Sequence, residues 1–257
     1  MLTFRRASST VPGSDFRVVM LGDSITAGSP VAQWFTYFAT LVNAGLKAAT
    51  PTVSASGPRL SSAPAASPTS SIIWFNSGIP GNDCTNYLSD TIAVRVTAYK
   101  PDMVIVMNGV NCQQHSGTPG TTGILTTDAQ CTTNHPLIIS QIQAQNPLAQ
   151  LCWISALCHN ENWPDGVNAF DTGPNSIDAK CAIDVAACAG ASPPILNIQL
   201  RTAFFAYQAI NNPTHANFGI LTAPADGIHP SAVNNAGQPT NGCQFISDQV
   251  MPFVRYA

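Results

Sequence analysis

Apolar and polar positions alternate along the chain in blocks that are typical of strands followed by helices. Short, continuous apolar runs, several of them rich in β-branched residues, predict strands buried on both faces. Five such strands are predicted, over residues 16–21, 72–75, 103–107, 150–155 and 194–198.

Between the strands, apolar residues recur at the spacing of an amphipathic helix. From 31 to 46 they form the i, i+3, i+4, i+7 stripe of a helix that lies on a sheet. Helices are predicted over residues 31–46, 85–99, 136–145, 176–189, 201–210 and 243–254. The segment 49–71, rich in Ala, Ser, Pro and Thr, predicts a long surface loop instead.

This order of elements predicts the fold class. Strands that alternate with helices, without hairpin turns, pair in parallel through right-handed crossovers. We therefore predict an α/β fold: a three-layer α/β/α sandwich, flavodoxin-like, with about five parallel strands. Residues 1–15 are expected to be an irregular lead-in, and residues 16–257 a single domain, which this length can support.

Composition narrows the range of partners. Charged residues make up only 9% of the chain and the net charge is −3, whereas about 25% is usual for a soluble domain. Without a basic stripe to neutralise phosphates, nucleic acid is excluded as a partner. No apolar stretch is long enough to insert across a membrane. An uncharged polar surface suits a neutral small-molecule or glycan ester, and the oligomeric state stays unknown.

The chain has eight cysteines. An even number favours disulfides and an extracellular or other oxidising location, although the first residues lack the apolar core of a signal peptide. There is no Cys-x-x-Cys pair, so the spacings argue against zinc. We accordingly expect no metal and no organic cofactor.

The first predicted strand ends in Gly22-Asp23-Ser24. A serine at a strand-to-helix turn lies at the carboxyl edge of the sheet, where ligands bind in open α/β folds. Its hydroxyl can act as a nucleophile, and its backbone N–H can face an oxyanion. Asp23 and Ser24 could equally cap a helix, and these residues alone do not decide between the two interpretations.

A second polar segment, Asp226-Gly227-Ile228-His229, precedes the last predicted helix. A nucleophilic serine needs a base and a group that orients the base, and Asp-x-x-His supplies both within one turn. Alone, the same residues are also compatible with a plain turn and a surface histidine. The other four histidines lack this spacing and are expected to be solvated or capping: His115, His135, His159 and His215.

Four motifs together are more specific than each alone. In chain order they are Gly22-Asp23-Ser24, Asn76-x-Gly78-x-x-Gly81, Gly109-x-Asn111 and Asp226-x-x-His229. In this order and spacing the chain resembles the SGNH, or GDSL, hydrolases, a superfamily of serine esterases and lipases. The resemblance implies a catalytic triad of Ser24 as nucleophile, His229 as general base and Asp226 as the group that orients it. It also implies an oxyanion hole made by the backbone N–H groups of Ser24 and Gly81 and the side-chain amide of Asn111.

The third motif departs from the family at Cys112, where aspartate is common. Cys84 follows the second motif, so Cys84 and Cys112 are expected on neighbouring strand exits. We consider two alternatives: a disulfide that stiffens the oxyanion hole, or two separate buried thiols.

The resemblance implies a serine ester hydrolase that works through an acyl-enzyme. The polar, weakly charged loops favour short acyl esters, in particular O-acetyl groups on a carbohydrate, with Trp163 as the candidate substrate contact. One alternative is a lipase or thioesterase that acts on longer acyl chains. Another is a glycan-binding module that has the same fold and no activity.

Overall fold

A computed structural model describes most of the chain. The described residues are 1–4, 16–27, 34–49, 59–60, 72–88, 91–108, 126–155, 177–211, 221, 229–235 and 237–256.

Within this part of the chain, the central sheet has six parallel strands in the order β3-β4-β2-β5-β6-β7. The strands are β2 (Phe16–Gly22), β3 (Arg59–Leu60), β4 (Ile72–Gly78), β5 (Met103–Asn108), β6 (Gln150–Ser155) and β7 (Leu196–Ile198). The five predicted strands are therefore confirmed, and only β3, two residues long, falls in a segment predicted as loop. In their own chain order those five lie 2-1-3-4-5, which is the flavodoxin order.

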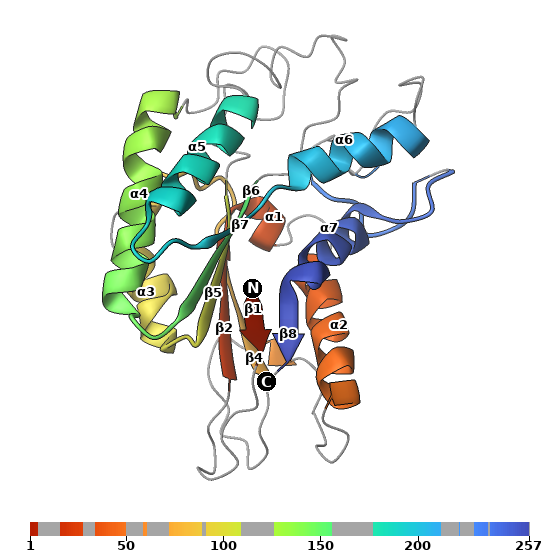
Figure 1. The fold of residues 1–257 in the computed structure, drawn as a ribbon, viewed down its shortest axis with the longest axis horizontal. Helices are drawn as coiled ribbons and strands as arrows, with labels where there is room; N and C mark the ends of the chain where they lie inside the picture. The colour runs from red at the N-terminus through yellow and green to blue at the C-terminus, as the bar shows by residue number, and fades with distance from the viewer. Residues whose placement is uncertain are drawn as a thin grey trace.

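Helices cover both faces of the sheet, which confirms the three-layer α/β/α sandwich (Figure 1). On one side lie α2 (Trp34–Ala49), α6 (Leu200–Asn211) and α7 (Gly242–Val250). On the other side lie α3 (Thr91–Arg95), α4 (Asp128–Gln145) and α5 (Ile177–Gly190). The short α1 (Ser24–Ala27) directly follows β2.

The central strand β2 shows why its sequence is continuously apolar. Val18 and Met20 belong to the core under α2, α6 and α7, whereas Val19 and Leu21 belong to the core under α3, α4 and α5. All four side chains are fully buried. A strand with helices on both faces has no solvent-exposed side, so polar alternation disappears.

The prediction of a single helix over residues 85–99 is wrong. The segment forms three short pieces: η1 (Asn86–Leu88), α3 and η2 (Thr97–Tyr99). Lys100 ends them in the left-handed conformation, with φ 50°. Ile92 and Val96, which were predicted to face inward, are nevertheless buried. The apolar spacing therefore indicated the buried face correctly, but not the interruptions between the helical pieces.

The helix predicted to begin near Pro136 begins eight residues earlier, at Asp128. Thr127 and Gln130 form a capping box at its start, with reciprocal side-chain to backbone hydrogen bonds. Pro136 lies inside α4. The earlier start matters because it places Cys131 and His135 on a helix rather than in a loop.

The termini differ most from expectation. Leu2–Phe4, expected to be irregular, form strand β1, which pairs in parallel with β8 (Val254–Tyr256). Phe4 is fully buried and packs against Phe16 and Trp74. The helix predicted to reach residue 254 ends at Val250, and η3 (Met251–Phe253), which contains a proline, connects it to β8.

None of the described helices is long and apolar enough to cross a membrane.

Candidate active site

Ser24 is the first residue of α1, and only Asp23 separates it from the end of β2. Strand β2 pairs with β4 on one side and with β5 on the other. The strand order reverses at this point, and the crevice beyond the carboxyl ends of such strands is the usual ligand site of an open α/β sheet. Ser24 therefore lies where the fold places a ligand.

Two glycines allow α1 to pack directly on the sheet edge. A Cβ on Gly22 would lie 2.1 Å from Thr26 Oγ1, and a Cβ on Gly78 would lie 2.3 Å from the backbone N of Ala27. Asp23 is buried, and its Oδ1 accepts a hydrogen bond from Ile25 N at 2.9 Å. Asp23 thus caps the turn while Ser24 stays partly exposed, so the two interpretations of this motif are compatible.

Asn76 belongs to β4 rather than to a turn after it, and it supports α1 from the neighbouring strand. Its Nδ2 donates to the carbonyl oxygen of Ala27 at 3.2 Å, and its Oδ1 accepts from Gly78 N at 3.0 Å. The second motif therefore holds the end of the serine-bearing turn.

Gly81 lies at the third position of a turn in which Asn82 N donates to the carbonyl oxygen of Ile79 at 3.1 Å. Its φ is +80°, and Pro80 precedes it, as in a type II turn. A Cβ at Gly81 would meet no atom of the described residues within 4 Å. The backbone conformation, and not close packing by these residues, therefore requires the glycine.

The segment that carries His229 is fixed against the start of α7. Ser231 N donates to the carbonyl oxygen of Leu221 at 2.9 Å, and Gly242 N donates to Ser231 Oγ at 3.0 Å. A Cβ on Gly242 would lie 1.9 Å from that same carbonyl oxygen. From the other side, Tyr37 on α2 donates its hydroxyl to the carbonyl oxygen of Ala232 at 3.0 Å.

These supports bring two residues together that are far apart in the sequence. His229 Nε2 lies 2.8 Å from Ser24 Oγ, and both side chains are partly exposed. This distance lets the hydroxyl donate to the imidazole, which is the geometry for activating a serine. Solvent or a substrate can reach the pair.

The other residues of the predicted site fall outside the described residues. They are Asp226, Asn111, Cys112 and Trp163, and their roles remain predictions. Three predicted site residues are described. Ser24 lies just beyond the end of β2, Gly81 lies beyond the end of β4, and His229 lies on the segment held against α7.

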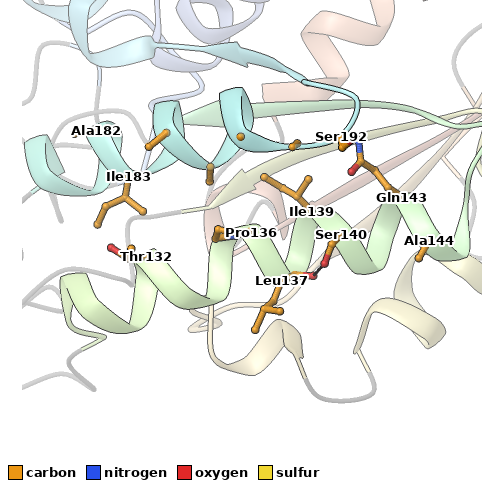
Figure 2. A pocket seen from close by; sticks show the side chains of 14 residues that line it. Thr132, Pro136, Leu137, Ile139, Ser140, Gln143, Ala144, Ala182, Ile183 and Ser192 are labelled. Carbon is orange, nitrogen blue, oxygen red and sulfur yellow. Dashed lines mark hydrogen bonds between the residues drawn. The ribbon is translucent and has the colours of Figure 1, made fainter.

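A groove between α4 and α5 is a separate feature (Figure 2). Small and aliphatic side chains such as Ile139, Ala182 and Ile183 line it, together with the hydroxyls of Thr132 and Ser140. Among the described residues, its lining has no carboxylate, imidazole, amine or thiol and includes neither Ser24 nor His229. It is not a candidate for acid–base chemistry.

His135, expected to be solvated or capping, is completely buried on α4. Its Nδ1 lies 2.8 Å from Oδ1 of Asp184, which is equally buried on α5, and its ring packs on Trp153. Sequence reasoning missed this residue because it placed the segment in a loop. The available signal was the spacing Cys131-x3-His135, which puts both side chains on one face of a helix.

Disulfides were expected from the cysteine count, but none forms among the six described cysteines, all of which are buried. Burial raises the pKa of the thiols of Cys181, Cys188 and Cys243 to about 12. These three are therefore unreactive thiols. Cys112, the partner of Cys84 in one of the two alternatives, lies outside the described residues.

Comparison with known proteins shows the fold. No family model and no curated protein sequence matches the chain. Among solved structures, a lipase/acylhydrolase from Enterococcus faecalis is similar with a TM-score of 0.59, at 16% identity over 93% of this chain and 94% of that one. A protein assigned as a GDSL-like lipase from Parabacteroides merdae is similar with a TM-score of 0.63, at 18% identity over 93% and 94%. An acetylxylan esterase from Geobacillus stearothermophilus is similar with a TM-score of 0.59, at 17% identity over 93% and 96%.

These similarities extend over nearly the whole length of each chain. The protein therefore has the α/β fold of GDSL-type acylhydrolases and esterases. At 16–18% identity, this similarity shows the fold alone, and the function has to be inferred from the site.

Proposed function

We propose that this protein is a serine ester hydrolase of the SGNH type that cleaves short acyl esters, in particular O-acetyl groups on a carbohydrate. The observation that carries the proposal is the 2.8 Å contact between His229 Nε2 and Ser24 Oγ at the carboxyl edge of the sheet. Nucleophile and base are in hydrogen-bonding distance at the place where this fold binds ligands.

The reaction proceeds in two halves. Ser24 Oγ attacks the ester carbonyl carbon while its proton passes to His229 Nε2, and a tetrahedral oxyanion forms. Collapse of this intermediate breaks the bond to the alcohol, which leaves with the proton from His229. Water then attacks the acyl-enzyme, His229 takes its proton and returns it to Ser24 Oγ, and the acid is released.

Three donors stabilise the oxyanion in this mechanism: the backbone N–H groups of Ser24 and Gly81 and the side-chain amide of Asn111. The turn at Gly81 supports its part: its φ is +80°, and no described atom lies within 4 Å of where a Cβ would be. Asp226 holds the imidazole of His229 in the tautomer that accepts the serine proton.

Two observations support a short acyl group on a carbohydrate. A structurally similar protein is an acetylxylan esterase, and the chain's 9% charged residues suit a neutral, hydroxyl-rich partner better than an ionic one. The alternative is a lipase or thioesterase that acts on longer acyl chains, in line with the similarity to a GDSL-like lipase.

An ester series tests both the activity and the acyl length. The wild type, Ser24→Ala and the control Ser140→Ala are assayed with p-nitrophenyl esters from acetyl to palmitoyl; Ser140 is an exposed serine on α4. We expect wild type and Ser140→Ala to prefer acetyl, and Ser24→Ala to fall to background. Equal background rates in all three would contradict the enzyme and favour a binding module, whereas a palmitoyl optimum would favour the lipase.

The carbohydrate part is tested separately, by measuring acetate released from acetylated xylo-oligosaccharides. Release that depends on Ser24 supports the proposal. Hydrolysis of p-nitrophenyl acetate without any release of acetate from the oligosaccharides would show that the alcohol part of the natural substrate is not a xylo-oligosaccharide.

A further inference from the structure

We propose that Cys84, Cys131 and His135 bind a zinc ion or a similar thiophilic divalent cation, at a site closed off from the active site. The three side chains are completely buried, and one potential ligand atom from each lies within 4.8 Å of the others. This inference is independent of the esterase activity proposed above.

The geometry of the sulfur atoms fits a shared metal ion. Cys84 Sγ and Cys131 Sγ are 3.5 Å apart. Two thiolates at about 2.3 Å from a tetrahedral zinc ion are about 3.8 Å apart, whereas the sulfurs of a disulfide are about 2.05 Å apart. The spacing is thus close to that of two ligands on one ion.

The imidazole supplies the third ligand, from the same helix as one thiol. Cys131 and His135 are four residues apart on α4, so their side chains lie on one face. Nδ1 of His135 lies 2.8 Å from Asp184 Oδ1, which leaves Nε2 for the metal. Nε2 is buried as well.

Asp184 is the feature that distinguishes a metal site from a disulfide. Metal-binding histidines usually donate their second ring N–H to a carboxylate, which fixes the tautomer and orientation of the ring. A disulfide between Cys84 and Cys131 would need neither the buried imidazole nor the buried carboxylate. The cost of burying both groups is explained if they hold an ion.

The site would join two elements. Cys84 follows the turn of Gly81 by three residues, and Cys131 and His135 belong to α4. Three protein ligands leave one tetrahedral position, and no fourth histidine, cysteine or carboxylate joins the cluster among the described residues. A water would fill that position.

Metal content is measured on protein purified with reductant and dialysed against zinc. We expect one zinc per chain in the wild type, and loss of stoichiometric zinc in Cys84→Ser and in Cys131→Ser. The matched control is Cys188→Ser, since Cys188 is a buried thiol of the same core layer outside the cluster. Cobalt(II) in place of zinc should give thiolate-to-metal charge-transfer absorption in the wild type and the control only.

The variant Asp184→Asn keeps all three ligands and removes the supporting carboxylate. It should weaken zinc binding about 10- to 100-fold, as loss of such a partner does in other zinc sites. Far-UV circular dichroism confirms that each variant is folded.

Any of three results would overturn the proposal. One is reduced, folded wild type that takes up no zinc and no cobalt. The other is zinc stoichiometry that survives unchanged in both cysteine variants. A Cys84–Cys131 disulfide found by peptide mapping would overturn it too if reduction of that bond does not restore metal binding.

Discussion

Two histidines of this chain lie in opposite settings, and each is held 2.8 Å from a polar partner. His229 is partly exposed at the carboxyl edge of the sheet and faces Ser24. His135 is fully buried on α4 and faces Asp184. An imidazole that a substrate can reach can move protons, whereas a closed one can only orient, pair or ligate. Access, more than the residue type, separates the two roles.

The two regions should therefore respond to mutation in different ways. Changes at the Ser24–His229 edge should reduce the rate and leave stability intact. Changes at the His135–Asp184 pair should reduce stability and leave the rate per folded molecule intact.

The largest effect is expected for His229→Gln. Without the base, Ser24 keeps its proton, and kcat/KM for p-nitrophenyl acetate should fall by at least about 10⁴-fold. The melting temperature should change little because the side chain is partly exposed. Retention of more than a tenth of the wild-type rate would remove His229 from the mechanism.

His135→Gln is the matched change in the buried region. It leaves the carboxyl group of Asp184 buried without its partner, which costs about 3–5 kcal/mol and should lower the melting temperature by roughly 10 °C. The rate below the transition should stay within about twofold of wild type. Thermal unfolding and activity are measured on chelator-treated protein, so that metal loss is the same in both samples. A large loss of kcat at unchanged stability would show that the two regions are not separate.

Asn111→Ala tests whether the side-chain amide of Asn111 is the third donor of the proposed oxyanion hole. Loss of one donor should lower kcat about 10²–10³-fold with a small change in KM, because the donor acts mainly in the transition state. An unchanged kcat would assign the third donor to another group.

Gly81→Ala gives the smallest expected effect. No described residue would clash with the new Cβ, so the expected cost is that of a left-handed conformation with a Cβ, about 1–2 kcal/mol. The control is Gly190→Ala at the end of α5, where a new Cβ would likewise clash with no described residue and which is not among the glycines with positive φ. Chemical denaturation should show Gly81→Ala destabilised and Gly190→Ala neutral or slightly stabilised. Equal effects would contradict the turn geometry.

Most of the fold could be predicted from local pattern. Buried parallel strands are continuous apolar runs, so the five longer strands were predictable to within about three residues. Apolar spacing also predicted most of the helices, but not the breaks between Asn86 and Tyr99 or the start of α4 at Asp128. Pairings between distant segments were not predictable. Residues Leu2–Phe4 form a strand only because Val254–Tyr256 lie beside them.

The two candidate sites also differ in how far they could be predicted from the sequence. Ser24 and His229 lie in short motifs with a known order, so the sequence predicted both residues although 205 positions separate them. The Cys84–Cys131–His135 cluster combines a turn and a helix at spacings that match no zinc pattern in the sequence. Pro136 also suggested a helix start after His135, and the capping box at Thr127 overrode it.

The central claim is that Ser24 Oγ is the nucleophile, and covalent trapping tests it most directly. The protein is incubated with a fluorophosphonate, and the modified residue is located by peptide mass spectrometry in wild type and in Ser24→Ala. The account predicts one phosphonyl group per chain, on Ser24, and none in Ser24→Ala. Labelling at another residue, or equal labelling of both proteins, would contradict it.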